Sequence, residues 1–338
     1  MTATLKDIAR LAGVSTATVS KIVNGKDHDI GEKTIEKVKS IIQEQDYRPN
    51  SLARSMKTKV TKTIGLIIPD VRNPFFTDLA RGAEDSANER GYSLLFCNSD
   101  DDLKKEMEYI NTLTEKQVDG IALAGSVKRN REIEEKFQVR VPIVTLDRDA
   151  YFKGIKGRVL IDNFNGAYDA VKYLIGLGHR RILFLSGRLD IRVSEERLAG
   201  YRKALEDSGI GFDGDLVAEG NFNFNFGYDY IMSGSLDGTV TAIFCGNDLI
   251  ALGAVKALKK LKKKVPEDIS IIGFDDIYLA SINTPELTTV RQPSYDLGYI
   301  AVGRLIDILE GIEHKQNMVE IKLELVVRES TGSLDVTV

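Results

Sequence analysis

The sequence of 338 residues predicts a mixed α/β protein in which a small helical domain precedes a body of two doubly wound parallel α/β lobes. In the first 45 residues, apolar side chains recur at helical spacing between capping residues and breaks. From Lys62 onward, short apolar runs alternate with helical runs, which is typical of parallel sheets covered by helices. Residues 1–62 hold 12 Lys and Arg against 7 Asp and Glu, whereas the remainder holds 34 against 43. This division favours a nucleic-acid-binding module joined to an acidic body.

The stretch 5–25 (LKDIARLAGVSTATVSKIVNG) predicts two short helices joined by a tight turn. Thr4 is expected to cap the first helix, with Asp7 completing a capping box three residues later. Gly13 ends that helix, and Ser15 is a good N-cap for the second helix.

The second helix is expected to expose a small, hydroxylated and basic surface made by Thr16, Ala17, Ser20 and Lys21. Hydroxyls and lysine can bond base edges or phosphates, and methyl groups can touch thymine, so this surface suits the DNA major groove. A helical hairpin in an ordinary core fits the same apolar pattern. The hairpin alone therefore leaves both interpretations open.

A third helix is expected at 32–45, and its apolar stripe can close a small three-helix core. A break follows at 46–50, where Pro49 disfavours helical angles in the residue before it. Residues 51–57 (SLARSMK) can form a helix but are too few to be stable alone, so a linker is the alternative interpretation.

The stretch 5–25 closely resembles the helix-turn-helix of the LacI/GalR family of bacterial transcription regulators. The resemblance continues through YRPNSLARSMK (47–57) and on to about Gly332. It implies a DNA-binding headpiece at 1–50 and a hinge helix or linker at 51–61 that folds when two subunits meet on DNA. Met56 would then enter the minor groove as an apolar wedge. The implied DNA-binding residues are Thr4, Ser15, Thr16, Ala17, Thr18, Ser20, Lys21, Asn24, Tyr47, Asn50, Leu52, Ala53, Arg54, Met56 and Lys57.

The body is expected at 62–332, followed by a tail at 333–338. Strands are predicted at 62–69, 92–97, 119–125, 141–147, 181–187, 216–220, 241–246 and 269–275, with one more strand and helix before the terminal strands. The family resemblance implies a periplasmic-binding-protein-like core in which the chain crosses between lobes three times. Lobe 1 would comprise about 62–162 and 292–322, and lobe 2 about 163–291 and 323–332.

Polar and aromatic side chains follow the predicted strands or open the next helix, where ligands of such sheets bind. Aromatic rings can stack on the apolar face of a sugar, carboxylates accept hydrogen bonds from its hydroxyls, and arginine and amide groups donate them. Each residue alone is more often a helix cap or an ion-pair partner, but their recurrence over seven loops favours one effector site. The predicted effector-binding residues are Asn73, Phe75, Phe76, Asp147, Arg148, Arg197, Phe222, Asn247, Asp275 and Gln292.

This set also resembles, position by position, the sugar contacts of the periplasmic ribose-binding protein. The adjacent pair Asp147 and Arg148 is the most specific part of the match. The resemblance implies a monosaccharide effector such as ribose, although similar pockets serve other sugars.

Enzymatic motifs are weak. The GIGFDG run (209–214) satisfies a dinucleotide-binding pattern but follows a predicted helix, so a helix end and loop is the better interpretation. No phosphate loop, nucleophile–base pair or zinc-ligand spacing is present, which predicts no catalytic residue, cofactor or metal. Cys97 and Cys245 lie in apolar runs and are expected to be buried, reduced thiols of a cytoplasmic protein without a membrane span.

The leading hypothesis is a sequence-specific DNA-binding repressor of a sugar-utilisation operon. It would bind an inverted repeat of double-stranded DNA as a homodimer, and a sugar between the lobes would change its operator affinity. The alternatives are a regulator whose co-effector strengthens DNA binding, a sugar receptor that does not bind DNA, and an enzyme on a doubly wound fold.

Overall fold

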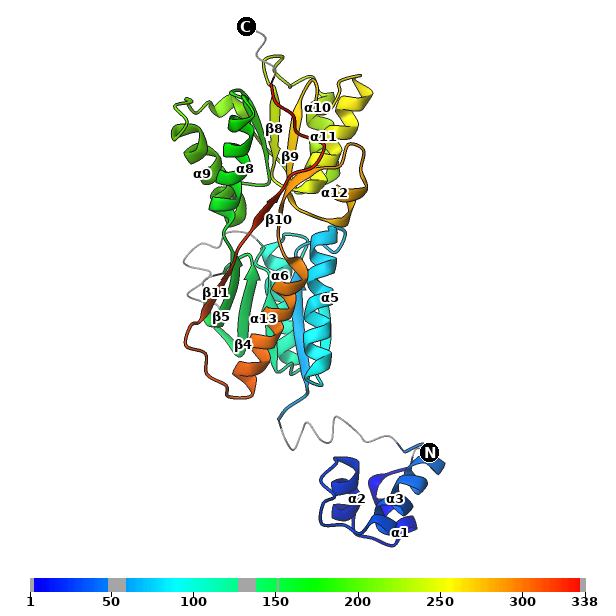
Figure 1. Cartoon of the computed structure of the whole chain (residues 1–338). Helices are drawn as coiled ribbons and strands as arrows, with labels where there is room; N and C mark the ends of the chain where they lie inside the picture. The colour runs from blue at the N-terminus through cyan, green and yellow to red at the C-terminus, as the bar shows by residue number, and fades with distance from the viewer. Residues whose placement is uncertain (1–2, 48–58, 127–137, 151, 335–338) are drawn as a thin grey trace. The chain divides into compact units, whose positions relative to one another are not determined.

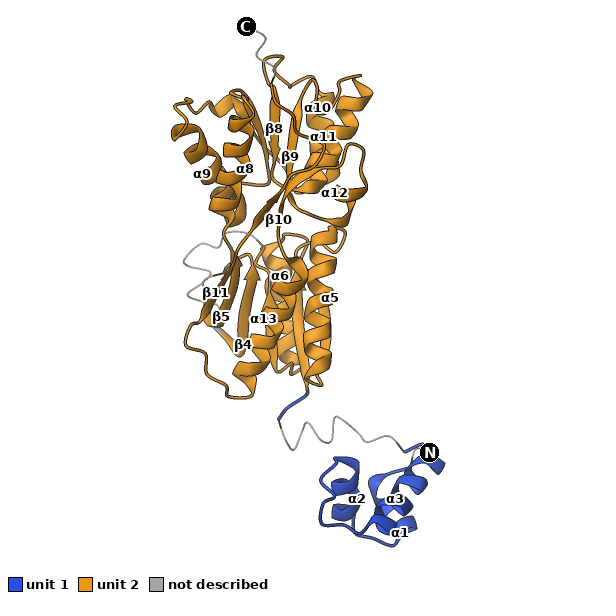
Figure 2. Ribbon diagram, viewed as in Figure 1, with its two compact units in different colours: residues 1–61 blue, residues 62–338 orange. Residues whose placement is uncertain are grey.

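The computed structural model describes residues 3–47, 59–126, 138–150 and 152–334. The chain divides into two compact units, residues 1–61 and residues 62–338 (Figure 2). Each unit has its own apolar core, and the fold class predicted from the sequence is confirmed.

The first unit contains α1 (Leu5–Ala12), α2 (Thr16–Val23) and α3 (Glu32–Glu44). The predicted capping box is present, because the Thr4 hydroxyl accepts a hydrogen bond from the Asp7 amide while the Asp7 carboxylate accepts one from the Thr4 amide. Gly13 ends α1 in the left-handed conformation, at φ 71°. The three helices enclose a small core centred on Ile8, Val19 and Val38.

The second unit holds two six-stranded sheets, one in each lobe (Figure 1). The first sheet is parallel throughout and has the order β11–β5–β4–β3–β1–β2. Its strands are β1 (Thr63–Ile68), β2 (Ser93–Asn98), β3 (Gly120–Leu123), β4 (Gln138–Asp147), β5 (Lys153–Ile161) and β11 (Met318–Ile321).

The second sheet has the order β12–β10–β9–β8–β6–β7, and only the β10–β12 pair among these described strands is antiparallel. Its strands are β6 (Ile182–Ser186), β7 (Val217–Glu219), β8 (Ala242–Cys245), β9 (Ser270–Asp275), β10 (Thr288–Arg291) and β12 (Glu324–Val326).

Helices cover both faces of each sheet. In the first lobe, α5 and α13 pack together on one apolar core, and α6 packs on the other. In the second lobe, α8 and α9 share one core, while α10 and α11 share the opposite one. The helices are α5 (Pro74–Glu89), α6 (Leu103–Glu115), α8 (Asn163–Gly176), α9 (Arg192–Glu206), α10 (Phe224–Met232), α11 (Asp248–Lys260), α12 (Tyr278–Ile282) and α13 (Ser294–Leu309), with a short 3₁₀ turn at Gly214–Leu216.

The chain passes between the lobes at three places: after β5, after β10, and between β11 and β12. In parallel sheets the carboxyl ends of the strands meet at one edge. The loops after β1, β4, β8 and β9 therefore bring side chains of both lobes to one region.

Two details differ from the sequence-based expectations. Strand β5 was not predicted, although its second half alternates buried and half-buried residues in the way of a strand. The prediction that both cysteines are buried was wrong for Cys97, which is half-buried because β2 is an edge strand. Cys245 lies fully buried in the central strand β8, and burial raises the pKa of its thiol.

Within the described residues, no helix is long and apolar enough to cross a membrane. The 209–214 run is a loop after α9, as predicted, with Gly209 in the left-handed conformation at φ 66°.

Candidate functional site

The second helix of the headpiece, α2, presents the surface expected from its sequence. Thr16, Ala17 and Lys21 are exposed, and Ser20 is half-buried. Ser15 caps the helix by accepting a hydrogen bond from the Thr18 amide at 3.0 Å.

Several of these groups already have partners within the unit. The Lys21 ammonium pairs with the Asp29 carboxylate at 2.5 Å, and the Asn24 amide donates to the Ser20 carbonyl at 2.6 Å. Tyr47 is half-buried against the three-helix core. The other predicted DNA-binding residues, namely Asn50, Leu52, Ala53, Arg54, Met56 and Lys57, lie outside the described residues.

In the second unit, all ten residues predicted to bind the effector line one cavity of about 20 Å³. They come from both lobes, because Asn73 caps α5 in the first lobe and Asn247 caps α11 in the second. The sequence analysis missed one lining residue, Val193, which lies one helical turn before Arg197 on α9. The i, i+4 spacing could have found it, because both residues lie on one face of the helix.

Aromatic rings form two walls of the cavity. Phe75 and Phe76 meet edge to face, with ring centroids 5.0 Å apart. The Arg148 guanidinium lies 5.5 Å from the ring of Phe76 and 5.5 Å from that of Phe222, and so it contacts rings of both lobes. The Phe222 ring fits because residue 187 is glycine, where a Cβ would stand 2.1 Å from the ring.

The polar groups of the cavity are tightly connected. The Gln292 amide donates to Asp275 at 2.5 Å, and the Arg148 guanidinium pairs with Asp101. Among the cavity residues, two buried polar atoms have no hydrogen-bond partner: Nε of Arg148, a donor that lies 3.6 Å from the Asp147 carboxylate, and Oε1 of Gln292, an acceptor. A buried donor and acceptor left unpaired are unfavourable unless a ligand or water satisfies them.

Burial changes the acid–base behaviour of the site. It raises the pKa of Asp147 and raises that of Asp275 to about 7, although neighbouring arginines oppose both shifts. It lowers the pKa of Arg197. The lining holds two carboxylates and two guanidinium groups, so the site suits a ligand that donates and accepts hydrogen bonds.

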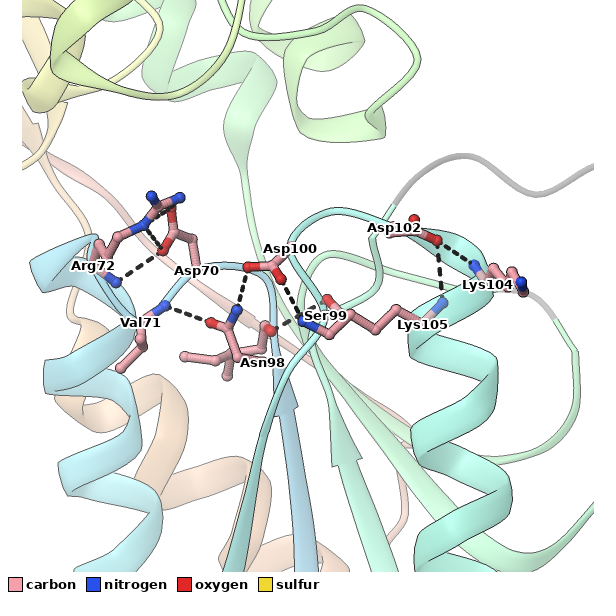
Figure 3. Close-up of polar contacts among 10 residues, drawn as sticks. Asp70, Val71, Arg72, Asn98, Ser99, Asp100, Asp102, Lys104 and Lys105 are labelled. Carbon is pink, nitrogen blue, oxygen red and sulfur yellow. Dashed lines mark hydrogen bonds and ion pairs between the residues drawn. The ribbon is translucent and has the colours of Figure 1, made fainter.

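Figure 3 shows polar contacts between two neighbouring loops of the first lobe. The Asn98 side chain accepts from the Val71 amide at 2.7 Å and donates to Asp100, which ties the β2–α6 loop to the β1–α5 loop. Asp102 caps α6 by accepting from the amides of Lys104 and Lys105.

This loop also supplies an acid, Asp101, that pairs with the cavity residue Arg148 from outside the lining. Asp100 and Asp101 both have φ of 56°, an unusual conformation for residues other than glycine. It aims Asp101 at the Arg148 guanidinium. The sequence analysis does not include Asp101 in the site, because no local pattern indicates a partner 47 residues away.

The described residues contain no group of three His, Cys, Asp or Glu side chains that could hold a metal ion. An exposed helix-turn-helix together with a two-lobed body around a polar cavity defines a DNA-binding regulator with an effector-binding body.

Comparison with known proteins gives the family. Residues 4–50 match the family described as bacterial regulatory proteins, lacI family, and residues 171–331 match a periplasmic binding protein-like domain. The chain is 42% identical to the ribose operon repressor of Escherichia coli (strain K12) over 309 residues, which is 90% of this chain and 92% of that protein. The chain belongs to the LacI family of transcription regulators, and the family prediction is confirmed.

Solved structures agree. A lac repressor dimer bound to operator and the anti-inducer ONPF has a TM-score of 0.88 at 28% identity, covering 98% of this chain and 100% of that one. A LacI family regulator from Enterococcus faecium with bound ribose has a TM-score of 0.72 at 31% identity, covering 81% of this chain and all of the other. The protein is therefore a DNA-binding transcription regulator rather than an enzyme.

Proposed function

We propose that this regulator represses a sugar-utilisation operon and that a monosaccharide, ribose or a close pentose or hexose, changes its operator affinity from the cavity. The observation that carries the proposal is the convergence of ten predicted residues on one cavity, in which a buried donor and a buried acceptor lack hydrogen-bond partners. The identity to a ribose operon repressor and the likeness to a ribose-bound regulator support it.

A sugar would use the cavity as follows. Asp147 and Asp275 would accept hydrogen bonds from ring hydroxyls, and Nε of Arg148 would donate one. Phe76 and Phe222 would cover the apolar face of the ring. The free volume of about 20 Å³ has room for about one water molecule, so the lobes must separate to admit a sugar. Sugar binding would thereby change the arrangement of the lobes.

On the DNA side, we propose that Thr16, Ala17 and Lys21 select bases, that Met56 enters the minor groove, and that the other predicted DNA-binding residues position the headpiece on the backbone. Lys21 would leave Asp29 and contact DNA instead. The two side chains form an exposed ion pair, which salt screens and with which DNA phosphate can compete. We also propose the functional limits of headpiece 1–50, hinge 51–61, body 62–332 and tail 333–338.

We propose that the active form is a homodimer on an inverted repeat. Apolar side chains are exposed on edge strand β2 at Leu95 and Phe96, and on α12 at Tyr278 and Ile282. Exposed apolar side chains on an unpaired sheet edge favour pairing with a second chain.

The test is calorimetry of the full-length protein with ribose, arabinose, xylose and glucose, in parallel with Asp275→Asn. The proposal expects one sugar to bind the parent protein, and expects the variant to bind it at least tenfold more weakly. Equal binding by the two proteins would show that the effector site lies elsewhere. Binding of none of the sugars would remove the monosaccharide assignment.

A further inference from the structure

A chain of polar contacts runs from the first lobe to the cavity arginine of the second. The Arg197 guanidinium donates through Nε to Oδ1 of Asn163 at 2.9 Å. The amide of Asn163 donates to Glu196 at 3.2 Å, and Arg192 donates to the other oxygen of Glu196 at 2.7 Å. Arg192 also pairs with Asp149 at 3.7 Å.

The last contact crosses the boundary between the lobes. Asp149 follows β4 of the first lobe, whereas Arg192 is the first residue of α9 in the second. Asp149 is a fixed anchor, because its side chain is only 4% exposed and also bonds Thr145 and Arg158, both at 3.1 Å. The Arg192 side chain is 41% exposed, so it can leave this anchor when the lobes separate.

Asn163, in the middle of this series of polar contacts, lies at one of the places where the backbone passes from one lobe to the other. Asn163 is the first residue of α8, directly after the passage from β5. It is 2% exposed and holds both Glu196 and Arg197. Arg197 itself is fixed at a second point by the Gly246 carbonyl and lies 3.7 Å from the Phe274 ring. A rotation between the lobes therefore takes place next to the residue that orients Arg197.

We propose that Glu196 and Asn163 are positioning residues for Arg197, and that Arg192 links them to Asp149 so that lobe closure and the orientation of Arg197 are coupled. The inference rests on the proposed function, because Arg197 matters to an effector only if the cavity binds one. It assigns a regulatory role to Arg192, which lines a neighbouring cavity and not the effector cavity itself.

The first test measures ribose affinity by calorimetry for Arg192→Gln, Arg192→Lys and Arg202→Gln. We expect Arg192→Gln to weaken binding about two- to fivefold, as is usual for a partly exposed ion pair, and Arg192→Lys to keep most of the affinity. Arg202→Gln is the matched control, since Arg202 lies on the same helix but stacks on Phe212 within the second lobe. Its affinity should equal that of the parent protein.

A double-mutant cycle identifies the partner. Asp149→Asn combined with Arg192→Gln should weaken binding by less than the sum of the two single changes, because both changes remove the Arg192–Asp149 contact. The effect of Arg192→Gln should also shrink between low salt and about 0.5 M salt, which loss of packing would not do. Additive losses that are insensitive to salt would overturn the coupling.

A second readout needs no sugar. Dyes on cysteines introduced at the exposed positions Lys104 and Lys259, in a Cys97→Ser and Cys245→Ala background, report the distance between the lobes by energy transfer. Excess unlabelled protein restricts the signal to one chain. Arg192→Gln should lengthen the mean distance and Arg202→Gln should not. A longer distance in a protein that does not bind ribose would refute the proposed effector but support the coupling. An unchanged distance would overturn the coupling.

Discussion

Asp275 lies at the end of β9 with its carboxyl group buried against Gln292 and facing two arginines. Its pKa is raised to about 7 by burial, so near neutral pH much of the group is protonated. A sugar hydroxyl donates a stronger hydrogen bond to the ionised form than to the protonated form. Ribose affinity is therefore expected to rise as the pH is raised from 6 to 8, and Asp275→Asn should make the profile flatter. Calorimetry at several pH values measures both profiles, and an affinity that falls over this range would contradict the role given to Asp275.

The same pKa shift has a consequence for stability. Because the folded-state pKa of Asp275 lies above the unfolded value of 3.8, its contribution to stability is fully present below pH 3.8 and is lost as the pH rises through about 7. Asp275→Asn removes this titration. The variant should therefore lose less free energy of unfolding than the parent protein between pH 5 and pH 8. Urea unfolding at the two pH values gives the comparison, and identical losses would show that Asp275 does not titrate there.

Substitution of Lys21 tests the role of the exposed surface of α2 in base recognition. Lys21→Ala is expected to weaken operator binding by about 1–3 kcal/mol and to relax the preference at one base pair. The control is Lys39→Ala, an exposed lysine on α3. Fluorescence anisotropy on operator and on random DNA separates the two effects. An equal loss on both DNAs would make Lys21 a phosphate contact.

At the scale of elements, the first lobe depends on the close crossing of α5 and α13. A Cβ at Gly82 would stand 2.0 Å from the Tyr295 carbonyl oxygen, so the two backbones can approach only because this residue is glycine. Gly82→Ala is expected to lower the free energy of unfolding of the body by about 1–3 kcal/mol or more, as overpacking does. Gly176→Ala on α8 is the control, because nothing lies within 4 Å of its added methyl group. Equal stabilities in urea unfolding would contradict the account of this crossing.

Elements also show what the sequence could predict. The capping box at Thr4, the break at Gly13 and the buried strands were predictable, because each rests on neighbouring residues alone. Strand β5 was not predicted, because glycines and lysines interrupt the apolar pattern of its sequence. Its alternation of buried and half-buried residues arises from packing between the neighbouring strands β4 and β11. The position of β2 at the sheet edge, and with it the exposure of Cys97, depends on the order of strands in space and not in the chain.

The residues of the cavity also divide into those that the sequence could predict and those that it could not. Its lining was predictable because parallel strands bring their ends together and because the family resemblance supplied the positions. The residues that contact the lining from outside the cavity could not be predicted from the sequence. Asp101, Asn163 and Glu196 act through partners that are distant in the chain or ordinary in type, so only the folded arrangement identifies them.

At the scale of the whole molecule, a DNA-binding unit and an effector-binding unit are joined through a segment that includes residues 48–58, which lie outside the described part. Met56→Ala should weaken operator binding and reduce the DNA bend, because an apolar wedge exchanges base stacking for a wider contact surface. Ribose affinity should stay unchanged, since the cavity belongs to the other unit. Bend angles from circularly permuted DNA fragments check this, and an unaltered bend would mean that Met56 does not enter the minor groove.

The central claim is that a sugar in this cavity changes the affinity of the protein for its operator. The most direct measurement is operator binding by fluorescence anisotropy at increasing ribose concentration, for the parent protein and for Asp275→Ala. The account predicts that ribose shifts the operator dissociation constant of the parent protein, and that the variant binds operator normally but does not respond at the same sugar concentrations. An equal response of both proteins to ribose would contradict it.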